Sequence, residues 1–351
     1  MKIGIVAPPW APVPPPGYGG TESVVDRLAR GVVSAGHEVL LWTTGDSTCP
    51  VPTGHVFDQA QGDRIGDAAV ELRHLIRGYE ALELWGADIV HDHTLIGPLY
   101  ARHRPGVRVV TTNHGPFNGE LFDLYRTIAD TVPVIAISHD QASRVHDVRI
   151  TAVIHHGLDP EMFFAGDGQG DEFGPYFAFL GRMAPDKGVD GAARIARAAG
   201  VRLLIAAKMR EPNERRFFHE NVEPLLDERI TYLGEVDAAE RLRLLGGARA
   251  LINPIRWPEP FGLVMIEALA CGTPVLSLRE GSAPELIDDG VTGFICDSLE
   301  ELTQRIDQVG GLDRAACRGV VEQRFSTQRM VADHLDLFER ILADQRAEVG
   351  G

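Results

Sequence analysis

Short aliphatic runs alternate with stretches of helical periodicity along the whole chain. The runs at residues 2–7 and 39–43 are continuous, which is typical of strands buried on both faces of a parallel sheet. Between them, Val24, Leu28 and Val32 fall on one helical face, and Gly36 predicts the end of that helix. Strand, helix and strand in this order predict a βαβ unit, and therefore an α/β fold.

The same alternation continues to the end of the chain. Further strands are predicted at residues 88–93, 107–112, 134–137, 153–155, 176–180, 201–207, 230–233, 250–253 and 273–277. Further helices are predicted at residues 67–84, 189–199, 264–271 and from 326 to about 344. Residues 165–174 are rich in glycine and acid and lack periodicity, which indicates an interdomain linker. We therefore predict two domains, residues 1–165 and 166–325, followed by a terminal helix, residues 326–351.

The stretch from residue 258 to 277 combines a loop, a helix and a strand. Pro258 and Pro260 keep the backbone extended around Glu259, which places Glu259 in the loop, whereas Glu267 lies in the helix. Along a helix, their spacing would correspond to roughly 12 Å, whereas paired glycosidase carboxyls stand roughly 5–9.5 Å apart. Two separate roles are therefore favoured, and the free N–H groups of the helix start suit a phosphate or a sugar oxygen. A purely structural role, as cap and solvated surface, stays equally open.

Two cations flank the first strand-to-helix turn of the predicted second domain. Arg182 offers a forked guanidinium and Lys187 a compact ammonium, and together they suit a diphosphate. They would stabilise the charge that develops on a departing phosphate. A pair of solvated loop residues is the alternative, since exposed arginine and lysine are common.

A glycine-rich turn follows the first strand and a proline-rich loop at residues 8–16. Gly19 and Gly20 let the backbone approach a ligand at a helix start, although a tight turn alone would also require glycine. The turn departs from the dinucleotide fingerprint at its last position, and Thr43 and Thr44 stand where that fingerprint has an acid. These departures disfavour a dehydrogenase.

Histidines stand at the ends of two predicted strands. His91 and His93 share one face of a strand and Asp92 the other, so at most two ligands converge and no metal site is expected. His114 follows the strand at 107–112, where α/β sheets place their ligands. A local hydrogen bond in a turn is the alternative role for His114.

Composition narrows the functional classes. The 351 residues are 44% hydrophobic and 24% charged, as in a globular protein, and the net charge of −16 argues against nucleic acid and against strong membrane association. No apolar run approaches the length of a membrane span, and a strand starting at residue 2 leaves no room for a signal peptide. Four cysteines without C-x-x-C spacing favour a reduced, cytoplasmic protein, and a homo-oligomer stays open.

The motifs together resemble one enzyme family. Glu259-Pro-Phe-Gly-Leu, followed by Glu267-Ala-Leu-Ala-x-Gly-Thr-Pro-Val, resembles the donor-site signature of retaining glycosyltransferases of family 4, and Gly-Arg-x-x-Pro-x-Lys-Gly at 181–188 matches the same family. The resemblance covers nearly the full chain, although His156 stands where the family has asparagine. It implies the GT-B architecture: two Rossmann-like domains facing each other across a deep cleft, with the terminal helix crossing back onto the first domain.

The resemblance also implies roles for individual residues. Glu259 would contact the hydroxyls of the donor sugar, Glu267 those of the ribose, and His114 would give polar support at the reacting centre. Other contacts to the nucleotide sugar would come from backbone groups. Those of Gly19 and Gly20 would contact the phosphates, and that of Val236 would contact the base. The sugar and the diphosphate would be contacted by the backbone of Phe261, Gly262 and Leu263. Arg182 and Lys187 would supply the countercharge, so neither a metal nor another cofactor is expected.

The function implied is metal-independent transfer of a hexose from a nucleotide diphosphate sugar to a hydroxyl acceptor, with retention by a front-face mechanism. A sugar-nucleotide epimerase or phosphorylase, or a non-catalytic partner of the same fold, is the alternative, because fold alone does not set function. The sequence names neither the nucleotide nor the acceptor.

Overall fold

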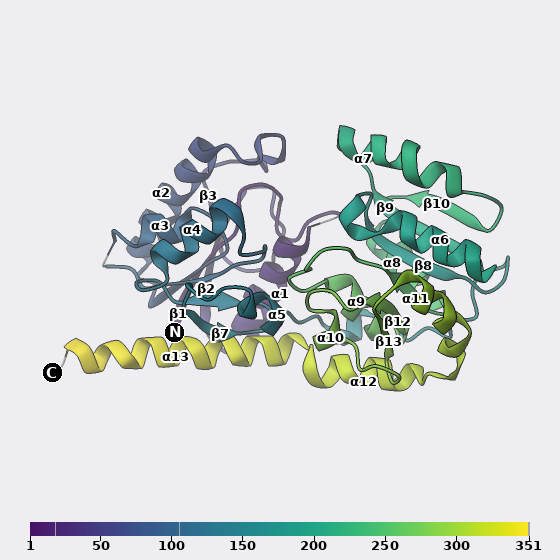
Figure 1. The fold of residues 1–351 in the computed structure, drawn as a ribbon. Helices are drawn as coiled ribbons and strands as arrows, with labels where there is room; N and C mark the ends of the chain where they lie inside the picture. The colour runs from purple at the N-terminus through teal and green to yellow at the C-terminus, as the bar shows by residue number, and fades with distance from the viewer. Residues whose placement is uncertain (18, 105, 350–351) are drawn as a thin grey trace. The chain divides into compact units, whose positions relative to one another are not determined.

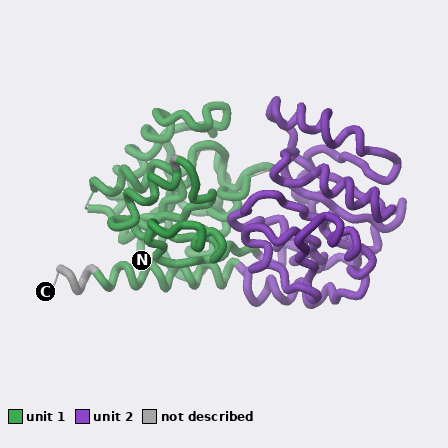
Figure 2. The backbone as a smooth tube through the Cα atoms, viewed as in Figure 1, with its two compact units in different colours: residues 1–158, 327–351 green, residues 159–326 purple. Residues whose placement is uncertain are grey.

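The chain forms two compact units. The computed structural model describes residues 1–17, 19–104 and 106–349. One unit comprises residues 1–158 together with 327–351, and the other comprises residues 159–326 (Figure 2). In the described residues no helix is both long and apolar enough to cross a membrane.

Unit 1 is built on a parallel sheet, and the described part of the chain supplies seven strands to it. Their order in the sheet is β3-β2-β1-β4-β5-β6-β7. The strands are β1 (Lys2–Val6), β2 (Glu38–Thr43), β3 (Thr53–His55), β4 (Ile89–Asp92), β5 (Val109–Thr112), β6 (Val134–Ala136) and β7 (Ile150–Val153). The short edge strand β3 was not predicted, and β7 lies a few residues before the strand predicted at 153–155.

Helices cover both faces of this sheet (Figure 1). They are α1 (Gly20–Ser34), α2 (Ala68–Trp85), α3 (Gly97–Ala101), α4 (Gly119–Ile128), α5 (His139–Ser143) and α13 (Thr327–Val349). Val90 of β4 faces a core shared with α2 and α4, whereas its neighbour His91 faces α13, where it meets the ring of His334. Helix α13 also packs on α1, where Val331 lies against the backbone of Gly31.

Unit 2 repeats the arrangement with six parallel strands among the residues described. Their order is β10-β9-β8-β11-β12-β13. The strands are β8 (Phe177–Arg182), β9 (Leu203–Lys208), β10 (Ile230–Gly234), β11 (Leu251–Asn253), β12 (Val275–Leu278) and β13 (Gly293–Cys296). The helices are α6 (Val189–Ala199), α7 (Pro212–Phe217), α8 (Ala238–Gly247), α9 (Leu263–Ala270), α10 (Ala283–Leu286), α11 (Leu299–Arg305) and α12 (Arg314–Arg324).

Both units therefore have the strand order of a Rossmann-like sheet, in which the order reverses beside the first strand. The reversal lies between β1 and β4 in unit 1 and between β8 and β11 in unit 2. The predicted α/β class with two Rossmann-like sheets is confirmed.

The glycine-rich segment at 165–174 is part of unit 2, and its interpretation as a linker was wrong. Its backbone N–H groups pair with the body of that unit: Gly166 donates to Cys271, and Gly170 donates to Gly247. Arg314 of α12 completes the attachment by donating to the carbonyl oxygens of Gly166, Gly246 and Ala248 and to the hydroxyl of Thr273, at 2.7–3.0 Å. The segment lacks periodicity because it is held by backbone hydrogen bonds rather than by an apolar face.

Replacing Arg314 tests this attachment. The variant Arg314→Met should lower the free energy of unfolding of unit 2 by about 3 kcal/mol, because several buried carbonyl oxygens lose a charged donor together. Arg279→Met is the control, since its exposed guanidinium pairs with Asp297 at the surface and should contribute less than about 1 kcal/mol. Urea unfolding followed by circular dichroism measures both. Equal effects of the two variants would contradict the role of Arg314.

Candidate functional site

The candidate site of unit 2 lies where the strand order reverses. Arg182 is the last residue of β8, Lys187 lies in the turn that follows it, and the loop after β11 carries Glu259. The carboxyl ends of neighbouring parallel strands meet at one edge of the sheet, and α/β proteins bind ligands at this reversal. The structure thus places all three predicted charged residues at the edge where a ligand is expected.

Lys187 and Glu259 form a direct ion pair. Nζ of Lys187 donates to Oε2 of Glu259, and Nε1 of Trp257 donates to the same oxygen at 3.0 Å. The ammonium also lies 4.9 Å from the centre of the Trp257 ring, within cation–π range. Both charged side chains are largely buried, with 15% and 14% of their surfaces exposed. The ammonium and the carboxylate are therefore paired with each other, and the Trp257 indole contacts both of them.

Backbone contacts bring the two loops together. Gly188 follows Lys187 with a φ of 74°, and a Cβ at this position would lie 2.0 Å from the carbonyl oxygen of Pro254. Only glycine fits both the left-handed conformation and this close approach. The backbone N–H of Arg256 donates to the carbonyl oxygen of Asp186 at 2.8 Å. The separation of Lys187 and Glu259 is thus set by the main chain.

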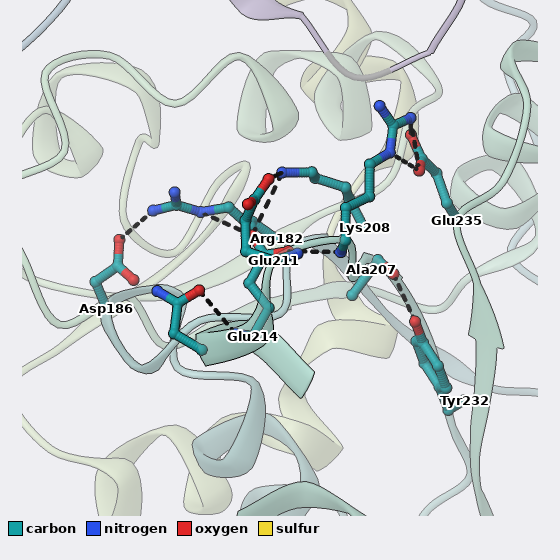
Figure 3. A network of polar contacts seen from close by, with 10 residues as sticks. Arg182, Asp186, Ala207, Lys208, Glu211, Glu214, Tyr232 and Glu235 are labelled. Atoms are coloured by element: carbon teal, nitrogen blue, oxygen red, sulfur yellow. Dashed lines mark hydrogen bonds and ion pairs between the residues drawn. The ribbon is translucent and has the colours of Figure 1, made fainter. Parts of the chain in front are cut away.

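Arg182 stands beside Lys208 over a buried carboxylate (Figure 3). Glu214 is almost fully buried, and its Oε1 lies 3.4 Å from Nζ of Lys208 and 3.9 Å from Nε of Arg182. Arg182 also donates to Asp186 at 3.2 Å. Its Nε is buried and has no hydrogen-bond partner among the described groups. This leaves a guanidinium N–H at the site that a ligand oxygen could satisfy.

Glu214 is held in its charged form by its surroundings. Burial alone would raise the pKa of Glu214, but backbone N–H groups of Glu211 and Arg210 and the ammonium of Lys208 outweigh it, so the pKa is lowered. The carboxylate is therefore ionised at neutral pH and supports both cations. Arg182 is also paired with Asp186 and Lys208 with Glu211, so both cations of this group already have carboxylate partners.

Helix α9 begins within the same site. Gly262 precedes it with a φ of 81°, Phe261 is buried, and Leu263 is its first residue. The hydroxyl of Ser282 donates to the carbonyl oxygen of Phe261, which fixes the start of the helix. One turn further, Glu267 is 6% exposed and its Oε1 lies 3.6 Å from Nη1 of Arg241. Glu267 is therefore buried and paired, in contrast to the alternative of a solvated surface residue.

Val236, predicted near a nucleotide base, is half-buried after β10. Asp237 follows it and caps α8, accepting from the backbone N–H of Glu240 at 2.8 Å. On the other side, Glu235 forms an ion pair with Arg210 that includes two short contacts from the same guanidinium, at 2.8 and 2.9 Å. The Val236 backbone is thus held between a helix cap and an ion pair.

The predicted residues of unit 1 lie at the corresponding edge of their own sheet. Gly19 is the N-cap of α1 and Gly20 its first residue. A Cβ at Gly19 would lie 2.7 Å from the Cβ of Pro15, so glycine is needed here for packing against the proline-rich loop. The structure thus explains Gly19 without a ligand, and a phosphate contact stays a prediction. Tyr18, between Gly17 and Gly19, lies outside the described residues.

His114 belongs to a group of five histidines, which we call the histidine cluster: His91, His93, His114, His156 and His334. The rings of His91 and His93 are 4.0 Å apart, and His156 stacks on His114 at 5.1 Å. Nδ1 of His93 lies 2.8 Å from Nε2 of His114, within hydrogen-bond distance. Burial lowers the pKa of every member, to about 3 for His114 and about 4 for His334, so the cluster is neutral at pH 7.

Asp92 faces away from the cluster, as the strand alternation predicted. Its carboxylate accepts from the hydroxyl of Tyr79 at 2.6 Å and from the backbone N–H and hydroxyl of Thr94, both at 2.7 Å. Burial raises the pKa of Asp92 to about 6 despite these bonds. Asp92 therefore anchors the loop after β4 and takes no part in the histidine cluster.

Several residues of these sites were not predicted from the sequence. Trp257 stands two positions before Glu259, and a tryptophan next to a proline-bracketed acid is a usable signal. Lys208 could have been found as one of the chain's three lysines, at the end of a predicted strand. Glu214 and the contact between His93 and His114 depend on tertiary packing and left no signal in the sequence.

Family models match both halves of the chain. A model described as "Glycosyltransferase Family 4" matches residues 18–162, and one described as "Glycosyl transferases group 1" matches residues 168–311. The D-inositol 3-phosphate glycosyltransferase of Mycobacteroides abscessus is 28% identical over 298 residues, which are 77% of this chain. That match spans 64% of the relative, less than two thirds of its length.

Solved structures share the fold across nearly the whole chain. The sucrose-phosphate synthase of Thermosynechococcus elongatus has a TM-score of 0.80 at 19% identity and covers 98% of this chain and 100% of its own. The Anabaena protein HepE, solved in complex with UDP and glucose, has a TM-score of 0.74 at 18% identity, covering 97% of this chain and 100% of its own.

Because these histidines are neutral in the folded protein, we expect the free energy of unfolding to fall in mild acid. Because burial lowers the pKa of His334 to about 4, the unfolded chain binds a proton between pH 6.5 and 4 that the folded chain does not. Stability should therefore fall as the pH falls through this window. Between pH 6 and 5, the free energy of unfolding of His334→Leu should fall less than that of the native protein. The difference should be up to about 1.4 kcal/mol per pH unit.

Urea unfolding at both pH values measures this slope. His74 is also buried, with its pKa lowered by burial to about 4, so His74→Leu should reduce the slope similarly. A slope that is unchanged in both variants would contradict the buried, neutral state of these imidazoles.

Proposed function

Because the chain belongs to glycosyltransferase family 4, we propose that it transfers a hexose from a nucleotide diphosphate sugar to a hydroxyl acceptor. The ion pair of Lys187 and Glu259 at the reversal of strand order carries this proposal. It sets a cation, for phosphate oxygens, next to a carboxylate that accepts hydrogen bonds from sugar hydroxyls. The cation would bind the phosphate side of a sugar–phosphate bond, and the carboxylate would bind the sugar side.

The donor diphosphate would be held by Lys187 and Arg182. The buried Nε of Arg182 makes no hydrogen bond with the described groups, although it lies 3.9 Å from Glu214, and an oxygen of the β-phosphate would satisfy it. Glu259 would receive hydroxyls of the sugar, and Glu267, held by Arg241, those of the ribose. The backbone N–H groups at Phe261, Gly262 and Leu263 would add donors at the start of α9. Val236 is proposed beside the base, and Gly19 and Gly20 beside the phosphates.

We propose transfer with retention by front-face attack. The bond between the anomeric carbon and the diphosphate oxygen breaks while the acceptor oxygen bonds to the same face of that carbon. The acceptor proton passes to the departing phosphate oxygen, so no protein base is consumed. Lys187 and Arg182 stabilise the charge that grows on the diphosphate. These two cations are the reason to propose that the reaction needs no metal.

The nucleotide donor is supported by the fold relative HepE, whose complex contains UDP and glucose. The acceptor side is proposed to lie in unit 1, where residues 8–16 and 113–125 would shape it. A reduced, cytoplasmic location is proposed as well, supported by four cysteines that are all buried and free.

A thermal-shift screen identifies the donor. UDP, GDP, ADP and TDP are added separately, without metal and with magnesium. A nucleotide at 100 times its dissociation constant should stabilise the protein by about 2.7 kcal/mol. Stabilisation by one nucleotide without metal supports the proposal. Stabilisation only with magnesium would contradict metal independence, and none by any nucleotide would contradict the donor site.

The variant Lys187→Ala tests the central ion pair. With the nucleotide sugar found in the screen, kcat should fall by about 10²–10³-fold, because the leaving group loses a preorganised cation. The loss of stability should be about 1–3 kcal/mol, from leaving the Glu259 carboxylate unpaired. Arg279→Ala, which removes an exposed cation of the same unit, should leave kcat unchanged. Full turnover in Lys187→Ala would overturn the assignment.

A further inference from the structure

His114 is the member of the histidine cluster that reaches the surface of unit 1. His114 is a half-buried residue, whereas His91, His93, His156 and His334 are buried. Nε2 of His114 faces Nδ1 of His93 at 2.8 Å. Nδ1 of His114 receives no hydrogen bond from any group in the described part of the chain. One ring nitrogen is thus engaged within the cluster and the other is available to a ligand.

The direction of the bond between His93 and His114 follows from the burial of His93. Both rings are neutral, because burial lowers the pKa of His93 well below its usual range and that of His114 to about 3. If His114 donated, His93 would carry its proton on Nε2, which is buried and has no partner among the described groups. If His93 donates, Nε2 is an unpaired acceptor instead. Unpaired buried N–H groups are the rarer of the two, so the second direction is favoured.

We propose that His93 is a positioning residue, whose Nδ1–H donates to Nε2 of His114 and so keeps the proton of His114 on Nδ1. His114 then presents a neutral N–H donor to an oxygen of the bound sugar. This inference rests on the proposed function, because that function makes His114 a contact of the substrate. The tautomer itself is a property of the protein alone.

Both rings are held from several sides. The backbone N–H of His93 donates to Val6 at 3.0 Å, and its ring packs against His91. Gln141 fixes the loop of His114, since its Nε2 donates to the carbonyl oxygens of Asn113 at 3.0 Å and Gly115 at 2.6 Å. The donor and acceptor nitrogens are therefore set before a substrate arrives, as an oriented catalytic contact requires.

Nuclear magnetic resonance of histidine labelled with ¹⁵N reads the tautomer directly. Two-bond correlations between ring protons and nitrogens show which nitrogen of His114 carries the proton, with His114→Gln used to assign its signals. We expect the Nδ1–H form in the native protein and in His93→Asn, whose amide nitrogen stands the same number of bonds from Cα as Nδ1. In His93→Leu, the Nε2–H form should appear. A native His114 protonated on Nε2 would overturn the proposal.

Steady-state kinetics then measure the consequence, with the nucleotide sugar and acceptor that the native protein turns over. In His93→Leu, kcat should fall by roughly 10- to 100-fold, as for partners that orient a functional histidine, while KM for the donor changes little. His93→Asn should retain kcat within about threefold of the native value, because it keeps the N–H donor. The control is His74→Leu, which removes a buried histidine whose ring lies against Trp42 outside the cluster.

The outcomes separate the two proposals. Equal kcat in His93→Leu and His74→Leu would overturn the positioning role, as would a loss in His93→Asn as large as in His93→Leu. If the native protein transfers no sugar to any acceptor, the proposed function fails, and the resonance experiment alone still confirms or overturns the control of the tautomer by His93.

Discussion

The candidate site depends on the close approach of two loops that follow β8 and β11. These strands are far apart in the sequence, but they are neighbours in the sheet because the strand order reverses between them. The absence of a side chain at Gly188 lets one main chain lie against the other at Pro254. The ion pair of Lys187 and Glu259 is a consequence of that contact. A long, flexible lysine could otherwise sample many positions, and the indole of Trp257 further limits them.

The two units use the same sheet order to build different electrostatic environments. In unit 2, the edge at the reversal is lined by arginine, lysine and carboxylates, and Glu214 supports two cations from beneath. In unit 1, the corresponding edge carries imidazoles that burial keeps neutral. The first arrangement suits an anionic diphosphate, whereas the second supplies directed but uncharged hydrogen bonds. The same strand order thus supports a charged edge in one unit and an uncharged, hydrogen-bonding edge in the other.

The sequence predicted most strands and helices because both sheets are parallel and buried, which leaves continuous aliphatic runs. It also placed Arg182, Lys187 and Glu259 beyond the carboxyl ends of predicted strands, because both motifs follow aliphatic runs in the sequence. It failed at residues 165–174, where backbone hydrogen bonds and Arg314 replace a hydrophobic pattern. Glu214 and the contact of His93 with His114 could not be predicted, because the partners come from segments that only the folded chain brings near. The roles of Gly19, Gly20 and Val236 stay predictions.

Unit 1 is discontinuous in the sequence, since residues 327–351 return to it after the whole of unit 2. During synthesis from the N-terminus, the sheet of unit 1 can assemble early, because all of its strands precede residue 158. The face around His91 and the surface of α1 at Gly31 must then wait for α13, which is synthesised after unit 2. The nascent chain therefore carries an uncovered, histidine-lined surface for the time needed to translate about 170 further residues, on the order of ten seconds or more. Helix α13 thus sets the moment at which unit 1 becomes complete.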